Sequence, residues 1–163
     1  MDSESATSRV TIIRATAADA DALTDIAFAA KRHWGYPEAW IESWRKLLTI
    51  RPEFIATHEI YVATRNDARV GFYGLELKDD KVDLLHMWVL PHAMGQGVGR
   101  CLFIHAVKRT KELRFLRLEI ESDPNAERFY LRMGARRVGS RACEFGKQRR
   151  ELPNLRYQID AAA

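Results

Sequence analysis

The chain has 163 residues, of which 47% are hydrophobic and 29% are charged, with a formal net charge of +4. This length and composition are typical of one soluble globular domain with its own core, and they argue against a disordered or fibrous chain. No apolar run approaches the roughly 20 residues needed to cross a membrane, and the polar N-terminus lacks the apolar core of a signal peptide. We therefore expect a cytoplasmic protein with no membrane partner.

Two cysteines, Cys101 and Cys143, do not form a CxxC pair, so neither a disulfide framework nor a zinc site is predicted. The positive excess is concentrated late in the chain, in Arg132, Arg136, Arg137, Arg141, Lys147, Arg149 and Arg150. Such a patch can attract nucleic acid, but these arginines are not interleaved with the aromatic residues of a single-strand binder. A solvated face, or attraction for an anionic cofactor, is the preferred interpretation. No nucleic-acid partner and no metal are expected.

The N-terminal part of the chain is predicted to form one strand and two helices. Residues 1–8 are polar and are expected to form a flexible tail, so that the folded domain spans 9–163. A β-branched strand is predicted at Val10–Arg14, and apolar residues at helical spacing predict a helix over Ala17–Lys31. A second helix is predicted over Pro37–Leu48, because proline suits a first turn and an apolar stripe follows it.

The middle of the chain is predicted to form a three-stranded meander followed by a helix and a further strand. Polar turns separate the strands, which are predicted at Glu59–Thr64, Val70–Leu77 and Val82–Leu90. A helix from about Gln96 to Leu113 leads to an alternating strand at Phe115–Glu121. Since a helix crossover joins parallel strands, the third and fourth of these strands are expected to be parallel neighbours.

The C-terminal part is predicted to add a helix and two strands. Asp123, Pro124 and Asn125 open a helix that runs to Met133, and strands are predicted at Ala135–Gly139 and Leu155–Asp160. The arginine-rich segment between these two strands has no strong pattern. The expected fold class is α/β (α+β), a single domain with four helices and a mixed, mostly antiparallel sheet of about six to seven strands.

The most informative stretch is a glycine-rich turn between a strand and a helix. The strand Leu84–Leu90 runs into Pro91, and Gly95-Gln96-Gly97-Val98-Gly99-Arg100 then opens the following helix. The first N–H groups of a helix have no intrahelical partner, and the helix dipole adds positive charge there. Glycine lets a phosphate approach the backbone closely. The turn therefore predicts a site for a pyrophosphate-bearing cofactor.

Two nucleotide-binding motifs match this turn poorly. A dinucleotide fingerprint requires G-x-G-x-x-G in an opening βαβ unit, whereas Gly95, Gly97 and Gly99 are spaced two apart and follow a meander. A P-loop requires Gly-Lys-Ser/Thr, whereas this turn ends in Gly99-Arg100-Cys101. The remaining candidate is a pyrophosphate cradle for coenzyme A.

At this point the sequence resembles the GCN5-related N-acetyltransferase (GNAT) family. Met87–Pro91 followed by Met94–Gly99 is similar to the family's strand, proline loop and Arg/Gln-x-x-Gly-x-Gly/Ala helix start. Asn125 and Tyr130 lie on the next predicted helix, as in the family, and the order of elements also matches, so the resemblance covers nearly the whole chain. Met94 departs from the usual Arg or Gln, and Ala135 replaces an aromatic residue that often follows the glycine.

The resemblance implies a sheet splayed at its centre and acetyl-CoA as co-substrate, with no metal. The acetyl group would pass directly to a primary amine of a small molecule or peptide in a ternary complex. A non-catalytic acyl-CoA-binding or sensor module is the alternative, and a homodimer is compatible with either. The resemblance implies cofactor contacts at Met87, Trp88, Val89, Met94, Gly95, Gln96, Gly97, Val98, Gly99, Arg100, Asn125, Phe129 and Tyr130.

The resemblance also implies catalytic and acceptor residues. Tyr130 would be the general acid that protonates the leaving thiolate, because a phenol suits that transfer. Asp83 and Glu121 are the leading candidates for the general base, with Asp83 expected on the strand face of Leu85 and Met87; Glu76, Glu119, His33 or water remain alternatives. The acceptor pocket is expected to include three aromatic residues of one loop, namely His33, Trp34 and Tyr36.

Overall fold

The computed structural model describes residues 9–145 and 147–160, so the predicted tail at 1–8 lies outside the described residues. Seven strands form one sheet in the order β1-β2-β3-β4-β5-β7-β6. Only β4 and β5 pair in parallel among the neighbours in this sheet. The strands are β1 (Thr11–Arg14), β2 (Glu59–Arg65), β3 (Ala68–Leu77), β4 (Val82–Val89), β5 (Arg117–Glu121), β6 (Arg136–Phe145) and β7 (Gln148–Gln158).

The described residues contain six α-helices rather than the four expected from the sequence. They are α1 (Ala20–His33), α2 (Glu38–Ser43), α3 (Arg45–Leu48), α4 (Pro52–Thr57), α5 (Val98–Glu112) and α6 (Glu127–Arg132), with 3-10 turns η1 (Ala17–Asp19), η2 (Pro91–Ala93) and η3 (Pro124–Ala126). The predicted second helix is divided at Trp44, whose backbone leaves the helical region. The six residues of α4 are too few to produce a hydrophobic period, although Pro52 marks the first turn.

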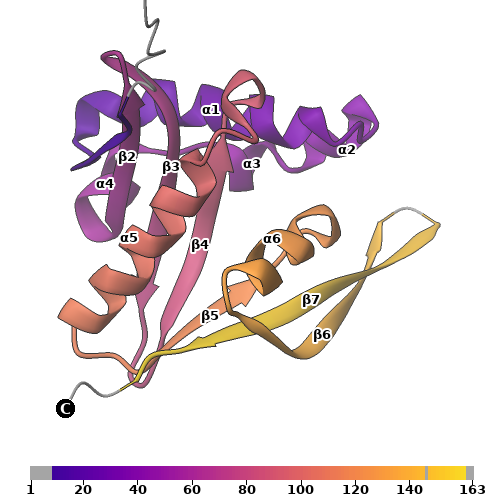
Figure 1. Cartoon of the computed structure of the whole chain (residues 1–163). Helices are drawn as coiled ribbons and strands as arrows, with labels where there is room; N and C mark the ends of the chain where they lie inside the picture. Colours follow the sequence, from indigo (N-terminus) through magenta and orange to yellow (C-terminus); the bar gives the residue numbers. More distant parts are fainter. Residues whose placement is uncertain (1–8, 146, 161–163) are drawn as a thin grey trace, which may run out of the picture.

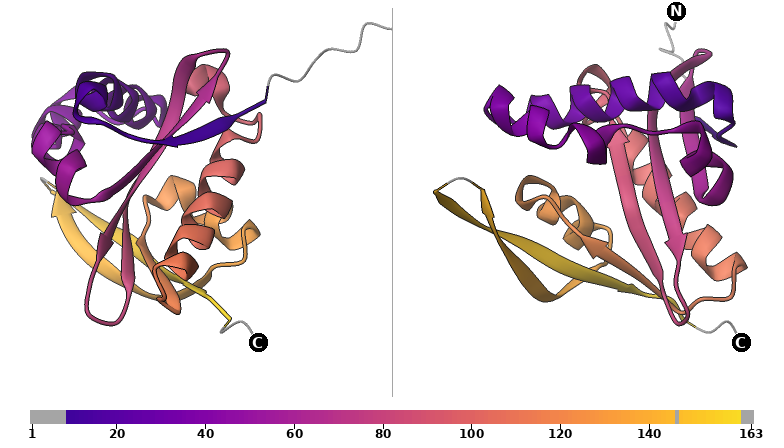
Figure 2. Two further views of the ribbon diagram at one scale, coloured as in Figure 1. Left: turned by 90° about the vertical axis from the view of Figure 1, so that its left-hand side faces the viewer. Right: turned by 180° about the vertical axis from the view of Figure 1, so that it is seen from behind.

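Helices cover both faces of the sheet (Figures 1 and 2). Helix α5 packs on one face, and α6 joins the same core cluster there. The helices α1 to α4 pack on the other face, against β2 and β3. In the described residues, no helix is both long and apolar enough to cross a membrane.

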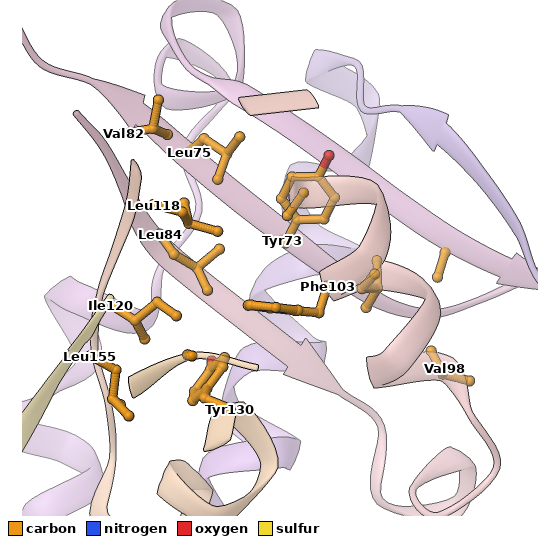
Figure 3. Close-up of a cluster of buried hydrophobic side chains, with 14 of the residues drawn as sticks. Tyr73, Leu75, Val82, Leu84, Val98, Phe103, Leu118, Ile120, Tyr130 and Leu155 are labelled. Atoms are coloured by element: carbon orange, nitrogen blue, oxygen red, sulfur yellow. The ribbon is translucent and has the colours of Figure 1, made fainter. Parts of the chain in front are cut away.

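The larger core cluster lies between the sheet and α5. Side chains of β3, β4, β5 and β7 point into one cluster with Phe103 of α5 and Tyr130 of α6 (Figure 3). Tyr73 and Phe103 are almost completely buried there. This core holds the two halves of the sheet together on one face, close to the point at which β4 and β5 separate.

The sheet opens between β4 and β5, as the resemblance implied (Figure 1). Their parallel pairing covers three positions and ends at Leu84 and Ile120. Beyond Leu84, β4 continues to pair with β3, whereas β5 pairs with β7. Among the described strands, none therefore pairs with the edge of β4 that faces β5 from Leu85 to Val89. Backbone amides on such an edge are available to an extended ligand.

A β-bulge in β4 corrects one expectation about Asp83. In the β3–β4 register, Gly74 pairs with His86 and the next residue of β3 pairs with Leu84, so Leu85 has no partner. One extra residue reverses the alternation of side chains beyond the bulge. Asp83 therefore shares a face with His86, whereas Met87 lies on the opposite face with Leu84. The predicted placement of Asp83 on the face of Met87 is wrong.

The last two strands form a long hairpin that extends away from the rest of the sheet (Figure 2). Strand β6 continues to Phe145, and β7 begins at Gln148, whereas the sequence predicted much shorter strands. Strand β6 is an edge strand, and most of its residues are exposed on both faces. Without a buried face, its sequence has no apolar alternation, which explains why the pattern did not indicate a strand.

Candidate active site

A cavity of about 450 Å³ lies where β4 and β5 separate. Its walls include the open part of β4, the end of β5, the glycine turn before α5, and the segment from Ser122 to Tyr130. Helix α1 contributes Ala30, which extends the cavity toward the opposite face of the sheet. The cavity therefore connects the predicted cofactor turn with the predicted acceptor side.

Most of the predicted cofactor residues line this cavity. They are Met87, Trp88, Val89, Met94, Gly95, Gly97, Gly99, Arg100, Asn125, Phe129 and Tyr130. The other two predicted residues, Gln96 and Val98, do not line it. Val98 is buried in the core. The amide Nε2 of Gln96 donates to the carbonyl of His92, and its Oε1 accepts from Arg65, so this side chain holds the turn in place.

The glycine turn has a backbone that suits an anion. Gly95 and Gly97 have φ angles of 73° and 85°, in the left-handed region that disfavours residues with a Cβ. Gly97 is the N-cap of the 15-residue helix α5, so the first free N–H groups of that helix follow it directly. A Cβ at Gly99 would lie 3.4 Å from the ring of Phe129. The turn is therefore compact, and its residues fit a pyrophosphate group.

Tyr130 is a buried residue in the wall of the cavity. Its ring lies beside Phe103 (Figure 3). The centroid distances are 5.7 Å to Phe103 and 5.1 Å to Phe129. Burial, together with the carboxylate of Asp123, raises the pKa of Tyr130 above its ordinary value. Within 9–145 and 147–160, no hydrogen-bond partner of the Tyr130 hydroxyl is found, although Tyr130 lines the cavity. The phenol is therefore a protonated donor at neutral pH.

The two leading base candidates lie in different places. Asp83 lies beside Lys81, whose Nζ is 3.1 Å from its Oδ1, and does not line the cavity. Glu121 does line it. Arg141 donates two hydrogen bonds of 2.9 and 2.8 Å to the Glu121 carboxylate, and these hydrogen bonds lower its pKa. The structure therefore brings only Glu121 of this pair to the cavity.

His86, which no sequence motif indicated as a site residue, lines the cavity. The indole Nε1 of Trp88 donates a 3.0 Å hydrogen bond to His86 Nδ1. Burial and the neighbouring His58 lower the pKa of His86 to about 4, so the ring is neutral at pH 7. Because Nδ1 accepts the indole hydrogen, the ring proton lies on Nε2, and His86 does not have a free basic nitrogen. His86 and Trp88 lie two residues apart on the same face of β4, which brings these two rings together.

Of the predicted acceptor residues, only Trp34 lines the cavity. His33 packs edge-on against Trp34 and is exposed. Tyr36 instead stacks on Trp40 and meets Trp44 edge-on at 5.1 Å. The aromatic loop is therefore divided between the cavity wall and a second cluster beside it.

Asp123 connects the cavity wall to this second cluster. Its carboxylate accepts a 2.6 Å hydrogen bond from Lys31 and 2.9 to 3.0 Å bonds from the Tyr36 hydroxyl and the backbone N–H of Asn125. The side chains of Lys31 and Asp123 are 12% and 11% exposed, so this is a nearly buried ion pair. Burial alone would raise the pKa of Asp123, but Lys31 and the surrounding donors hold it below the ordinary value.

Asp123→Asn is expected to lower the free energy of unfolding at pH 7 by about 3 kcal/mol, because it leaves the Lys31 ammonium buried without its counter-charge. The contribution of Asp123 is present above its unfolded pKa of about 4 and is lost as the pH falls through the lower folded pKa. The difference between wild type and variant should therefore shrink in acid. Urea unfolding at pH 7 and pH 3 measures both values. An equal difference at the two pH values would contradict this account of the ion pair.

In the part of the chain that the structure describes, no group of three or more His, Cys, Asp or Glu residues is arranged to hold a metal ion. The polar groups that line the cavity are instead single side chains and backbone amides. Such groups suit an organic ligand with an extended arm.

Comparisons with known proteins agree with this arrangement. Residues 56–134 match the model of the acetyltransferase (GNAT) domain, a segment that contains the meander, the glycine turn, β5 and α6. No curated protein matches the chain in sequence. Among solved structures, the PaiA N-acetyltransferase of Thermoplasma acidophilum in complex with coenzyme A is 19% identical, with a TM-score of 0.76, 93% of this chain and 99% of that chain being covered.

Two further structures have the same fold. The ribosomal-protein-S18-alanine N-acetyltransferase of Escherichia coli is 20% identical, with a TM-score of 0.73 and coverage of 95% of this chain and 97% of that chain. YncA of Salmonella typhimurium, a putative acetyltransferase with acetyl-CoA, is 21% identical, with a TM-score of 0.68 and coverage of 96% and 97%. Residues 56–134 thus match a GNAT acetyltransferase domain, and nearly the whole chain has the same fold as these solved acetyltransferases.

Proposed function

We propose that this chain is an N-acetyltransferase, which transfers the acetyl group of acetyl-CoA to a primary amine of a small molecule or peptide. The observation that carries the proposal is the meeting of three features in one cavity: the open edge of β4, the glycine turn of α5 and the side chain of Tyr130. Two structural neighbours contain coenzyme A or acetyl-CoA, which supports the choice of donor.

The donor would bind along the edge of β4. The pyrophosphate lies at the first N–H groups of α5, where Gly97 leaves room for it. The pantetheine arm pairs with the backbone of Met87–Val89 as an added strand would, because those residues have no partner toward β5. An amide N–H near Val89 polarises the thioester carbonyl. Phe129 and Asn125 bound the other side of this path.

The leaving thiolate would take its proton from Tyr130. A thiol has an ordinary pKa of about 8.5, and Tyr130 has a pKa above that of free tyrosine, so the phenol is still protonated when the thiolate leaves. Burial of its ring holds the hydroxyl in one place. Proton transfer to the leaving group then avoids the release of a free thiolate.

We infer that Glu121, rather than Asp83, takes the proton of the acceptor ammonium, because only Glu121 lines the cavity. The lowered pKa of Glu121 means that it holds this proton briefly and passes it to water. Glu121→Gln is expected to lower kcat/KM for the amine about 10-fold to 100-fold. Asp83→Asn, a matched change on β4, is expected to leave it within about twofold. The reverse order of effects in steady-state assays would reject this assignment.

The proposed function is tested by thiol release from acetyl-CoA across a panel of primary amines, with mass spectrometry of the acetylated product. Amine-dependent thiol release and a matching acetylamide are the expected results. A non-catalytic acyl-CoA-binding module is the second candidate, and the pairing of Glu121 with Arg141 favours it because a paired carboxylate is a weak base. Tight acetyl-CoA binding without release for any amine would support that module and reject the enzyme.

A further inference from the structure

A cluster of two cations and four aromatic rings lies next to the cavity on the acceptor side. Lys31 Nζ lies 4.3 Å from the ring centroid of Trp44, and the Arg150 guanidinium lies 4.9 Å from that of Tyr36. The indole of Trp40 and the ring of Phe145 complete the cluster at a centroid distance of 4.7 Å. Lys31 belongs to α1 and Trp40 to α2, whereas Phe145 and Arg150 belong to the β6–β7 hairpin. We call these six residues, Lys31, Tyr36, Trp40, Trp44, Phe145 and Arg150, the cation–aromatic cluster.

The charges in this cluster do not balance. Lys31 and Arg150 have side chains only 12% and 13% exposed. Asp123 is the single carboxylate within 4 Å of either cation among the described residues, and its oxygen lies 2.6 Å from Lys31 but 3.8 Å from Arg150. One carboxylate thus faces two nearly buried cations. Buried charges are costly unless they are paired, so the surplus positive charge indicates a place for an anion.

Arg150, one of the two cations of this cluster, has more hydrogen-bond donors than partners among the described residues. A guanidinium has five N–H donors, and in residues 9–145 and 147–160 the hydrogen bond found for the Arg150 side chain is one of 2.8 Å, from Nη2 to the Tyr36 hydroxyl. Arg150 lies close to the cavity, because its Nη2 is 3.8 Å from an oxygen of Asp123, which lines the cavity. Its remaining N–H donors can form two parallel hydrogen bonds to a carboxylate.

The position of Arg150 on its strand places it on the acceptor side. On β7, Leu155 packs into the core with α5, so residues of the opposite parity, Arg150 included, belong to the other face. Glu121, which lines the cavity, pairs with Asn154 of that same parity. The adjacent Arg149 belongs to the core-side parity and is exposed. Only one of these two neighbouring arginines is thus directed to the acceptor side.

We propose that the acceptor is an amine that also carries a carboxylate, such as an amino acid, and that Arg150 binds this carboxylate. The proposal rests on the proposed function and names its substrate class. Lys31 stays paired with Asp123, while the carboxylate neutralises Arg150 and the aromatic rings enclose the ion pair. The amine of the same molecule then extends toward Glu121 and the thioester end of the cavity.

The test compares amino acids with their amides, for example glycine with glycinamide and 4-aminobutyrate with 4-aminobutyramide. Within each pair the carbon skeleton is the same, and the amide replaces the carboxylate by a neutral group of similar size. An amino amide is the less basic amine and is more fully deprotonated at pH 7, so basicity alone favours the amide. We expect kcat/KM to favour the carboxylate at least 10-fold in one pair. In Arg150→Gln, KM for that carboxylate should rise about 30-fold, while KM for the amide changes little.

Arg149→Gln is the matched control and should keep the wild-type preference. Arg150→Lys keeps the positive charge without the two parallel donors of the guanidinium, and it should recover part of the preference. Unchanged affinity for acetyl-CoA shows that a variant is folded. If Arg150→Gln fails this control, Arg150→Lys takes its place in the comparison. Acetylation of neutral or cationic amines with no preference for the carboxylate would overturn this inference and leave the proposed function intact. No acetylation of any amine would overturn both.

Discussion

Tyr130→Phe is expected to lower kcat about 100-fold, because the thiolate then leaves without a positioned proton donor. The change removes one oxygen atom and keeps the ring against Phe103 and Phe129, so the fold and the acetyl-CoA affinity should change little. The raised pKa of Tyr130 means that this loss should persist across neutral pH. Stopped-flow or steady-state thiol release from pH 6 to pH 9 measures the effect.

Tyr157→Phe provides the control for Tyr130→Phe. The ring of Tyr157 packs on the same Phe103 at 5.7 Å, but Tyr157 does not line the cavity. Removal of its hydroxyl should leave kcat within about twofold, as expected of a change away from any critical feature. If Tyr130→Phe matches this control at all pH values, the proton donor is not Tyr130.

Gly97→Val is expected to weaken acetyl-CoA binding more than 10-fold. Gly97 has a φ of 85° as the N-cap of α5, and a β-branched residue is strongly disfavoured in that conformation. The backbone must therefore change, and the first N–H groups of α5 lose their common direction toward the pyrophosphate. A Cβ at Gly97 would meet no heavy atom within 4 Å, so the core should stay intact. Isothermal titration with acetyl-CoA gives the affinity.

Gly35→Val is matched to Gly97→Val in both conformation and space. Gly35 has a φ of 76°, and a Cβ there also meets nothing within 4 Å, but this residue lies in the loop between α1 and α2. Each of the two substitutions should lower the free energy of unfolding by about 1–2 kcal/mol. In Gly35→Val, however, the affinity for acetyl-CoA should stay within about twofold of wild type. Equal losses of affinity in the two variants would mean that the glycine turn does not bind the donor.

The glycine turn and its flanking elements could be predicted from the sequence because their signals are local. The strand before the turn, the φ-permissive glycines and the long helix after it each follow from a few adjacent residues. The parallel pairing of β4 and β5 also followed, because a helical crossover leaves little choice of direction. The family resemblance then supplied the opening between these two strands.

Other features could not be predicted because they depend on contacts between distant segments. The bulge at Leu85 inserts one residue into the regular alternation of side chains along β4. No local residue pattern indicates this bulge, so Asp83 was predicted on the wrong face. In the β6–β7 hairpin, the edge strand β6 is mostly exposed, so its sequence lacks the alternation of apolar and polar residues that would indicate a strand. The pairing of Lys31 with Asp123 joins residues 92 positions apart in sequence.

The site residues divide in the same way. Tyr130 and Asn125 belong to a short local motif that the sequence revealed, and both line the cavity. His86 did not stand out, because the bulge at Leu85 changes the face of β4 on which it lies relative to Asp83. The role proposed for Arg150 could not be predicted from a sequence with several nearby arginines, because only its position on the strand distinguishes it from Arg149.

Thermal unfolding of the intact protein with increasing acetyl-CoA tests whether the cavity between β4 and β5 binds the donor. A ligand that binds only the folded state stabilises it by about 2.7 kcal/mol at a concentration 100-fold above Kd. For a domain of this size we expect Tm to rise by roughly 5–10 °C, and to rise much less for Gly97→Val at the same concentration. An unchanged Tm at millimolar acetyl-CoA would contradict the assignment of the cavity between β4 and β5 as a donor site.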